Sequence, residues 1–136
     1  MIREEQVFIG SHLFPPPYCI ENSLKKLVDM YNVLKLNGTD RIVLSSWLMY
    51  QLLALHPFSD GTGRLSRHFC SWSLLSNGSI LPISFGNVKG VNKGHKTLIV
   101  CVQNSRSNVG IPSALSTRIL LSLFNSLNNL DSKQKQ

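Results

Sequence analysis

The sequence predicts a mainly α-helical domain, and three observations lead to this fold class. The chain has 136 residues, which is enough for one domain with one core. Four stretches carry apolar residues at helical spacing, and turn residues such as Asn-Gly separate them. Clear β-structure is expected only near the N-terminus, where β-branched and aromatic residues are bounded by a glycine.

The N-terminal segment predicts a strand followed by a rigid extension. Residues 4–10, EEQVFIG, contain β-branched and aromatic residues and end at a glycine, so we expect a short strand or one arm of a hairpin. Residues 14–18, FPPPY, contain three prolines. Each proline fixes its own φ and restricts the residue before it, so this segment is expected to be extended.

Two helices are expected to follow. Asn37–Gly38 ends the first of them, and Thr39 or Asp40 can cap a second that runs to about Leu55. The second is apolar almost all round, which indicates a central, buried helix. Pro57 turns the chain after it. The apolar stripe of the first helix consists of Ile20, Leu24, Leu27, Val28, Tyr31 and Leu34.

The second half of the chain predicts two more helices. Residues 64–78 form a third helix that ends at Gly78, and residues 79–90 read as a loop or short extended segment. Residues 95–103, HKTLIVCVQ, fit either a strand or a helix. Pro112 opens the last helix as its first residue. The apolar stripe of that helix consists of Leu115, Ile119, Leu123, Leu127 and Leu130.

Charge and cysteine usage limit the function classes. The net charge of +7 and the pI near 9.7 favour a nucleotide, a nucleic acid or an acidic surface as partner, although a basic surface without a dedicated partner also fits. No apolar stretch reaches the ~18 residues of a membrane span, so we expect no membrane partner. Three widely spaced cysteines fit a reduced compartment, such as the cytoplasm or the host of a delivered effector, and the compartment stays open.

The stretch HPFSDGTGRLSR has the features of an anion site between two helices. A buried helix ends at His56, and a new helix begins near Gly63 or Arg64. The first N–H groups of a helix lack internal partners and carry the positive end of the helix dipole. Gly61 and Gly63 allow a phosphate to approach the backbone. Arg64 and Arg67 lie three apart, on neighbouring parts of one helix face, where both can bind phosphate oxygens.

Two further groups in this stretch suit phosphate chemistry. Asp60 is the only acid between Asp40 and Asp131, and beside a polyphosphate it suits Mg²⁺. His56 stands where an imidazole can take a proton from an attacking hydroxyl. Each residue alone also fits an ordinary cap, turn or solvated face, but the combination points to a site.

The same stretch resembles the signature of the Fic (filamentation induced by cAMP) family, H-P-F-x-D/E-G-N-G-R-x-x-R, at eight of its nine fixed positions. The segment QVFIGSHLFPPP resembles the family's flap, and NVGIPSALSTRILLSLF resembles its closing segment and helix. The resemblance covers residues 3–127 and implies a Fic-type helical bundle with a short β-hairpin flap near the N-terminus.

The resemblance implies transfer of AMP from ATP to a Ser, Thr or Tyr hydroxyl of a target protein, with Mg²⁺ as cofactor. His56 would be the general base, Asp60 would hold the metal, and Phe58 would anchor the loop in the core. The nucleotide and phosphate ligands would be Gly61, Thr62, Gly63, Arg64 and Arg67. The flap would align the target as an added strand through Gln6, Val7, Phe8, Ile9 and Gly10.

The chain departs from the family pattern at Thr62, where the family has Asn. That Asn donates its amide to the transferred phosphate, and the loss of one such donor can cost about 10²–10³ in rate. If the position needs a positive φ, a β-branched residue is also strained there. The inhibitory S/T-x-x-x-E-G/N motif of many relatives is missing, since Pro17 stands where its Ser or Thr should be.

These features predict one Fic-like domain over residues 1–130, with the flap at 3–13, the motif at 56–67 and a polar tail at 131–136. The family helices that precede the flap are absent from this chain, so a longer parent protein or a homo-oligomer is expected. Two functions remain as alternatives to the transferase. One is an impaired Fic-like domain that binds nucleotide or a protein partner without turnover. The other is a small basic nucleic-acid-binding domain, which the scattered charges disfavour.

Overall fold

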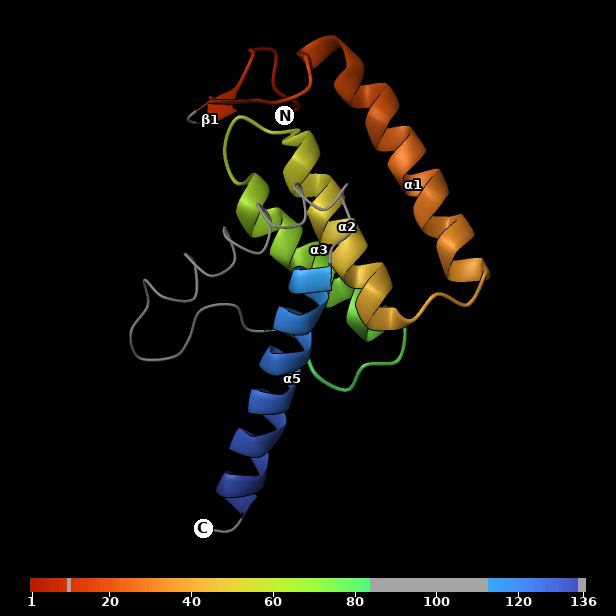
Figure 1. Ribbon diagram of the computed structural model, residues 1–136, viewed down its shortest axis with the longest axis vertical. Coiled ribbons are helices and arrows are strands. Elements are labelled where there is room, and N and C mark those ends of the chain that lie inside the picture. Colours follow the sequence, from red (N-terminus) through yellow and green to blue (C-terminus); the bar gives the residue numbers. More distant parts are fainter. Residues whose placement is uncertain (10, 84–112, 135–136) are drawn as a thin grey trace.

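The computed structural model describes residues 1–9, 11–83 and 113–134, and within them the fold is mainly α-helical, as predicted (Figure 1). The four helices of these residues are α1 (Ile20–Leu36), α2 (Arg41–Leu55), α3 (Thr62–Ser76) and α5 (Ser113–Gln134). The short N-terminal elements are β1 (Phe8–Ile9), β2 (His12–Leu13) and the 3-10 helix η1 (Pro17–Cys19). The ambiguous segment 95–103 and Pro112 lie outside the described residues.

Helix α2 lies at the centre and contacts α1, α3 and α5. The hairpin sits at one end of this bundle, beside the turn that joins α2 to α3, and α5 extends past the opposite end (Figure 1). The N- and C-termini therefore lie at opposite ends of the molecule (Figure 1). None of the described helices combines the length and apolar character that crossing a membrane requires.

The predicted hairpin is present at the N-terminus. Strand β1 pairs with β2 in antiparallel register, with Phe8 opposite Leu13 and Ile9 opposite His12. Gly10 lies outside the described residues. The prediction that residues 14–18 are all extended is wrong at its end, where η1 begins at Pro17. The physical reason for this difference is that proline suits the first turn of a helix, where its missing N–H is not needed as a donor.

The ends of α1 and α2 follow the local signals in the sequence. Gly38 has a φ of 74° just after α1. Asp40, rather than Thr39, caps α2, and its Oδ1 accepts hydrogen bonds from the N–H groups of Ile42 at 2.8 Å and Val43 at 3.3 Å. Val28 was expected to belong to the apolar stripe of α1, but 54% of its surface is exposed.

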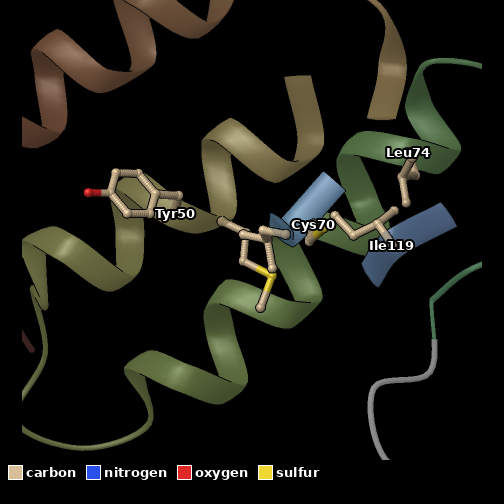
Figure 2. Packing of buried hydrophobic residues seen from close by; sticks show 6 residues of the cluster. Tyr50, Cys70, Leu74 and Ile119 are labelled. Atoms are coloured by element: carbon tan, nitrogen blue, oxygen red, sulfur yellow. The ribbon is translucent and has the colours of Figure 1, made fainter. Parts of the chain in front are cut away.

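Two hydrophobic clusters place α2 at the centre, as its uniformly apolar sequence predicts. The first joins α2, α3 and α5 through Met49, Tyr50, Cys70, Leu74, Leu115 and Ile119 (Figure 2). The second joins α1 and α2 through Tyr31, Leu44, Leu48 and Leu52. The stripe predicted for α5 is buried only near its start, since Leu127 and Leu130 are exposed. The C-terminal part of α5 extends past the bundle (Figure 1).

Cys70 is expected to resist alkylation in the folded protein. It is fully buried in the first cluster, and burial raises the pKa of its thiol to about 12, because the thiolate is poorly solvated there. Cys19 is only partly buried. Peptide mapping after iodoacetamide treatment at pH 8 should show Cys19 modified and Cys70 protected until denaturant is added. Because the thiol's pKa is raised in the folded state, the free energy of unfolding should fall as the pH rises from 9 towards 12. Equal modification of both thiols in the native protein would contradict this packing.

Candidate functional site

His56 stands at the C-terminal end of α2 in a left-handed backbone conformation, with φ 47° and ψ 61°. Among the described residues it is the only non-glycine residue with a positive φ. Glycine usually fills this position at a helix end, and another L-residue there is strained by about 1–2 kcal/mol. The His56 ring lies against the ring of buried Phe14, with the centroids 4.6 Å apart. A strained backbone at the end of a buried helix thus positions the imidazole.

The loop after His56 is closed by the hydroxyl of Thr62. Thr62 Oγ1 accepts a hydrogen bond from the Phe58 N–H at 3.3 Å and donates one to the Phe58 carbonyl at 3.2 Å. The Thr62 side chain is buried, and only 3% of the residue is exposed. Thr62 is the first residue of α3, which therefore starts slightly earlier than expected near Gly63 or Arg64.

The position of Thr62 does not require a positive φ, because its backbone is helical. The strain considered for a β-branched residue is therefore absent. Its hydroxyl is engaged with the loop backbone, so only the backbone amide of Thr62 is presented at the helix start. The expectation that Phe58 anchors the loop in the core is wrong. Phe58 is half-buried and lines an open pocket, while a bridge to Ile2 and the Thr62 hydroxyl hold its backbone.

The two glycines of the motif have different roles. Gly61 precedes α3 with a φ of 82°, a conformation that other residues adopt only with strain. Its amide donates to Asp60 Oδ1 at 2.7 Å, so this N–H is already bonded. A Cβ on Gly63 would meet no atom of the described residues within 4 Å apart from its chain neighbours and the backbone of its own helix turn, so there is space for a ligand beside it. Of the three amides expected to face phosphate, those of Thr62 and Gly63 make no hydrogen bond to the described part of the chain.

Asp60 and Arg64 form an ion pair at the start of α3. Arg64 Nη2 lies 3.0 Å from Asp60 Oδ2, and both side chains are mostly exposed. Such a surface pair contributes little to stability, so it can be replaced readily by a stronger partner for either charge. Arg67 donates from Nε to the Gly63 carbonyl at 3.1 Å.

A pocket of about 390 Å³ opens beside this ion pair. Its lining consists of Phe58, Asp60, Gly61, Arg64, Leu65 and His68. The structure thus brings three of the expected site residues into one pocket, whereas His56, Thr62, Gly63 and Arg67 are next to it in the chain but outside the lining. Sequence reasoning missed His68, although its i, i+4 spacing from Arg64 on one helix could have indicated it.

No group of three potential metal ligands occurs within the described ranges. Asp60 is therefore the single carboxylate offered to a metal at this site. A lone, exposed carboxylate fits Mg²⁺, because this ion is commonly held by one or two carboxylates together with water and substrate phosphates.

The flap residues divide into those bonded within the hairpin and those exposed. Gln6 Nε2 donates to the Phe14 carbonyl at 2.7 Å, and the Val7 carbonyl accepts from the Phe14 N–H at 3.1 Å. Phe8 is exposed. Within residues 1–9, 11–83 and 113–134 the sheet has two strands, so one edge of β1 is not paired with any strand of these ranges.

Comparisons with known proteins agree with the predicted family. The sequence model of the Fic/DOC family matches residues 2–74. A Fido domain-containing protein from Dictyostelium discoideum is 34% identical over 82 residues, which cover 60% of this chain and 57% of the relative. The protein adenylyltransferase Fic-1 of Caenorhabditis elegans is 32% identical over 85 residues, which cover 60% of this chain and 17% of the relative.

The fold is similar to two solved structures. A fragment of Fic-1 from C. elegans superposes with a TM-score of 0.80 at 22% identity, covering 98% of this chain and 37% of that one. A Fic-domain-containing signalling protein from Bacteroides thetaiotaomicron gives a TM-score of 0.65 at 23% identity, covering 96% of this chain and 48% of that one. The chain thus spans less than two thirds of the length of each of these relatives and structures.

Proposed function

Because the chain belongs to the Fic/DOC family, we propose that it transfers AMP from ATP to a hydroxyl group of a target protein. Relatives from C. elegans and Aquifex aeolicus, matched over part of their length, carry the names protein adenylyltransferase and probable protein adenylyltransferase. The observation that carries the proposal is the turn between α2 and α3. Asp60 and Arg64 line one pocket there, the Thr62 and Gly63 amides begin α3, and His56 follows the last residue of α2 just before the motif loop.

The start of α3 is the proposed phosphate site. The amides of Thr62 and Gly63 are the first N–H groups of a 15-residue helix, where the helix dipole adds positive charge. Arg64 and Arg67 follow on the same helix, and their exposed or half-exposed guanidinium groups can turn to the outer phosphates of ATP. A triphosphate would replace Asp60 as the partner of Arg64, which frees the carboxylate for Mg²⁺. The ion, when bound, neutralises phosphate charge.

His56 is the proposed general base. Its imidazole would accept the proton of a target Ser, Thr or Tyr hydroxyl while the hydroxyl oxygen attacks the α-phosphorus of ATP. The bond to the β-phosphate breaks in the same displacement, and pyrophosphate leaves. His56 directly follows the last residue of α2 in a left-handed conformation, and its ring is held against Phe14.

The flap is the proposed guide for the target protein. Among the strands that the structure describes, only β2 pairs with β1, and an extended target segment can pair with the other edge of β1. Phe8 is exposed on β1 and can contact a target side chain. Gln6 was expected to contact the target, but its side-chain amide donates to the Phe14 carbonyl and so stabilises the base of the hairpin.

A domain that binds nucleotide without turnover is the second candidate, and one observation favours it. The hydroxyl of Thr62 is engaged by Phe58, so this position presents no side-chain donor for the transferred phosphate. The two functions are separated by incubating the chain with α-labelled ATP, Mg²⁺ and a cell lysate. Labelled protein bands support transfer, whereas calorimetric ATP binding without any labelled band supports the second candidate.

Arg64→Ala is expected to weaken ATP binding by about 10- to 100-fold, since a charge-assisted hydrogen bond contributes roughly 1.5–3 kcal/mol. Calorimetric titration with Mg-ATP measures this change. Arg41→Ala is the matched control, because it removes the same charge from the other end of α2, where Arg41 donates to the Gly78 carbonyl at 2.6 Å. If both variants lose affinity equally, net charge rather than the pocket binds the nucleotide.

A further inference from the structure

Arg3 is a buried cation in contact with the candidate base. Only 2% of Arg3 is exposed, and its guanidinium donates to three backbone carbonyls. Nε donates to the His56 carbonyl at 2.7 Å, Nη1 donates to the Glu5 carbonyl at 2.8 Å, and Nη2 donates to the Pro15 carbonyl. Its backbone N–H also donates to the Pro57 carbonyl at 3.0 Å.

These carbonyls belong to the parts of the site that must stay aligned. Glu5 precedes β1 and Pro15 follows β2, so Arg3 holds both ends of the hairpin. The His56 carbonyl belongs to the strained turn that ends α2. The bridge between Ile2 and Phe58 lies next to Arg3 and holds the same segment beside the motif loop. One side chain thus joins the flap to the base across 53 positions of sequence.

The chemistry of Arg3 argues for a specific role rather than for general packing. A buried charge is costly unless it is paired or fully hydrogen-bonded, and Arg3 takes part in neither of the two ion pairs of the described residues. Its stabilisation comes from carbonyl oxygens in three separate segments. A planar guanidinium has rigidly placed donors that can reach several acceptors at once, whereas the compact ammonium of lysine cannot reproduce this arrangement.

Phe14 provides a second contact between the same parts. Its ring is 4% exposed and lies between two imidazoles, 4.7 Å from His12 of β2 and 4.6 Å from His56. Movement of the hairpin end that Arg3 holds would therefore move the ring against which His56 rests.

We propose that Arg3 is a positioning residue that fixes the left-handed turn at His56 and ties the flap to it. Its effect on catalysis rests on the proposed function, but its effect on the turn and the flap does not. Arg3 does not line the pocket beside Asp60 and Arg64, so it should affect alignment of the base and target more than nucleotide affinity.

The test compares Arg3→Gln with Arg41→Gln, which makes the same chemical change at an exposed guanidinium–carbonyl bond at the opposite end of α2. Hydrogen exchange followed by mass spectrometry should show faster exchange at residues 5–15 and 55–58 for Arg3→Gln, with α1 and α3 unchanged. Arg41→Gln should leave both segments as in the wild type. Unchanged exchange in these segments, or a uniform increase over the whole chain, would overturn the proposal.

Arg3→Lys keeps the positive charge and covers the case in which Arg3→Gln does not fold. It should give an intermediate increase in exchange at the same two segments, because an ammonium cannot replace the three-way contact. Wild-type exchange in Arg3→Lys would show that charge alone suffices, and would also overturn the proposal.

Steady-state kinetics of Arg3→Gln separates a role in positioning the base from a role in binding ATP. If the wild type transfers AMP, Arg3→Gln should lower kcat by about 10- to 100-fold with little change in the KM for ATP, because misplacement of a catalytic group by about 1 Å can cost 10²-fold. A rise in KM with kcat unchanged would contradict the role. If the wild type transfers nothing, the proposed function fails, and the exchange experiment still decides whether Arg3 holds the turn and the flap.

Discussion

Replacing His56 with alanine is expected to reduce AMP transfer by about 10²- to 10⁴-fold, the contribution typical of a general base. ATP binding should persist, because the pocket beside Asp60 and Arg64 is lined without His56. Initial rates with α-labelled ATP measure the first effect, and calorimetric titration with Mg-ATP measures the second. A loss of affinity as large as the loss of rate would assign His56 to nucleotide binding instead.

The backbone of His56 supplies a sharper control than alanine alone. At a φ of 47°, asparagine and glycine are tolerated better than alanine. His56→Asn and His56→Gly should therefore keep or slightly raise the melting temperature while lowering the rate as much as His56→Ala. If His56→Asn retained the wild-type rate, the turn itself, rather than the imidazole, would be the important feature.

Features set by neighbouring residues were predictable from the sequence. The cap of α2 was predictable because the Asp40 carboxylate reaches amides only two and three residues ahead. The central place of α2 followed from its apolar residues on every side. The hairpin followed from a β-branched run that ends at a glycine. Each of these features depends on contacts or periodicity within a short window.

Features set by distant contacts were not predictable. Arg3 meets the His56 carbonyl across 53 positions, and a single arginine in a sequence shows no periodicity that marks it as buried. The exposure of Leu127 and Leu130 in the α5 stripe was unpredictable for the same reason. Their burial depends on whether residues distant in the sequence pack against them. Periodicity indicates which face is apolar, but not whether another element covers it.

Some features of the candidate site were predictable from the sequence, and others were not. The order of His56, Asp60, Gly61 and Arg64 in the sequence was enough to predict a helix end, a turn and a helix start. It was not enough to predict that the Asp60 carboxylate pairs with Arg64 and accepts from the Gly61 amide. Nor did it show that the Thr62 hydroxyl closes the loop, because Thr at a helix start is equally compatible with a hydroxyl turned to solvent.

Thr62→Asn is expected to raise the rate of AMP transfer by about 10²–10³-fold, the value of one well-placed donor to the transferred phosphate. In the wild type, Thr62 Oγ1 is engaged with the backbone of Phe58. An asparagine amide has both an acceptor and two donors. Its oxygen can accept the Phe58 N–H while its nitrogen remains available to phosphate, so the loop keeps one of its two contacts. Initial rates with α-labelled ATP at saturating target protein measure the gain.

Thr62→Val is the matched control, because valine has nearly the shape of threonine and no hydroxyl. It should lower the free energy of unfolding by about 1 kcal/mol through the lost hydrogen bonds to Phe58, without any gain in rate. If Thr62→Asn transfers AMP where the wild type binds ATP but labels nothing, the wild-type chain is a nucleotide-binding domain without turnover. If Thr62→Asn and the wild type transfer AMP at the same rate, the threonine at position 62 does not limit the rate of transfer. The open amides of α3 together with Arg64 and Arg67 would then suffice to stabilise the transferred phosphate.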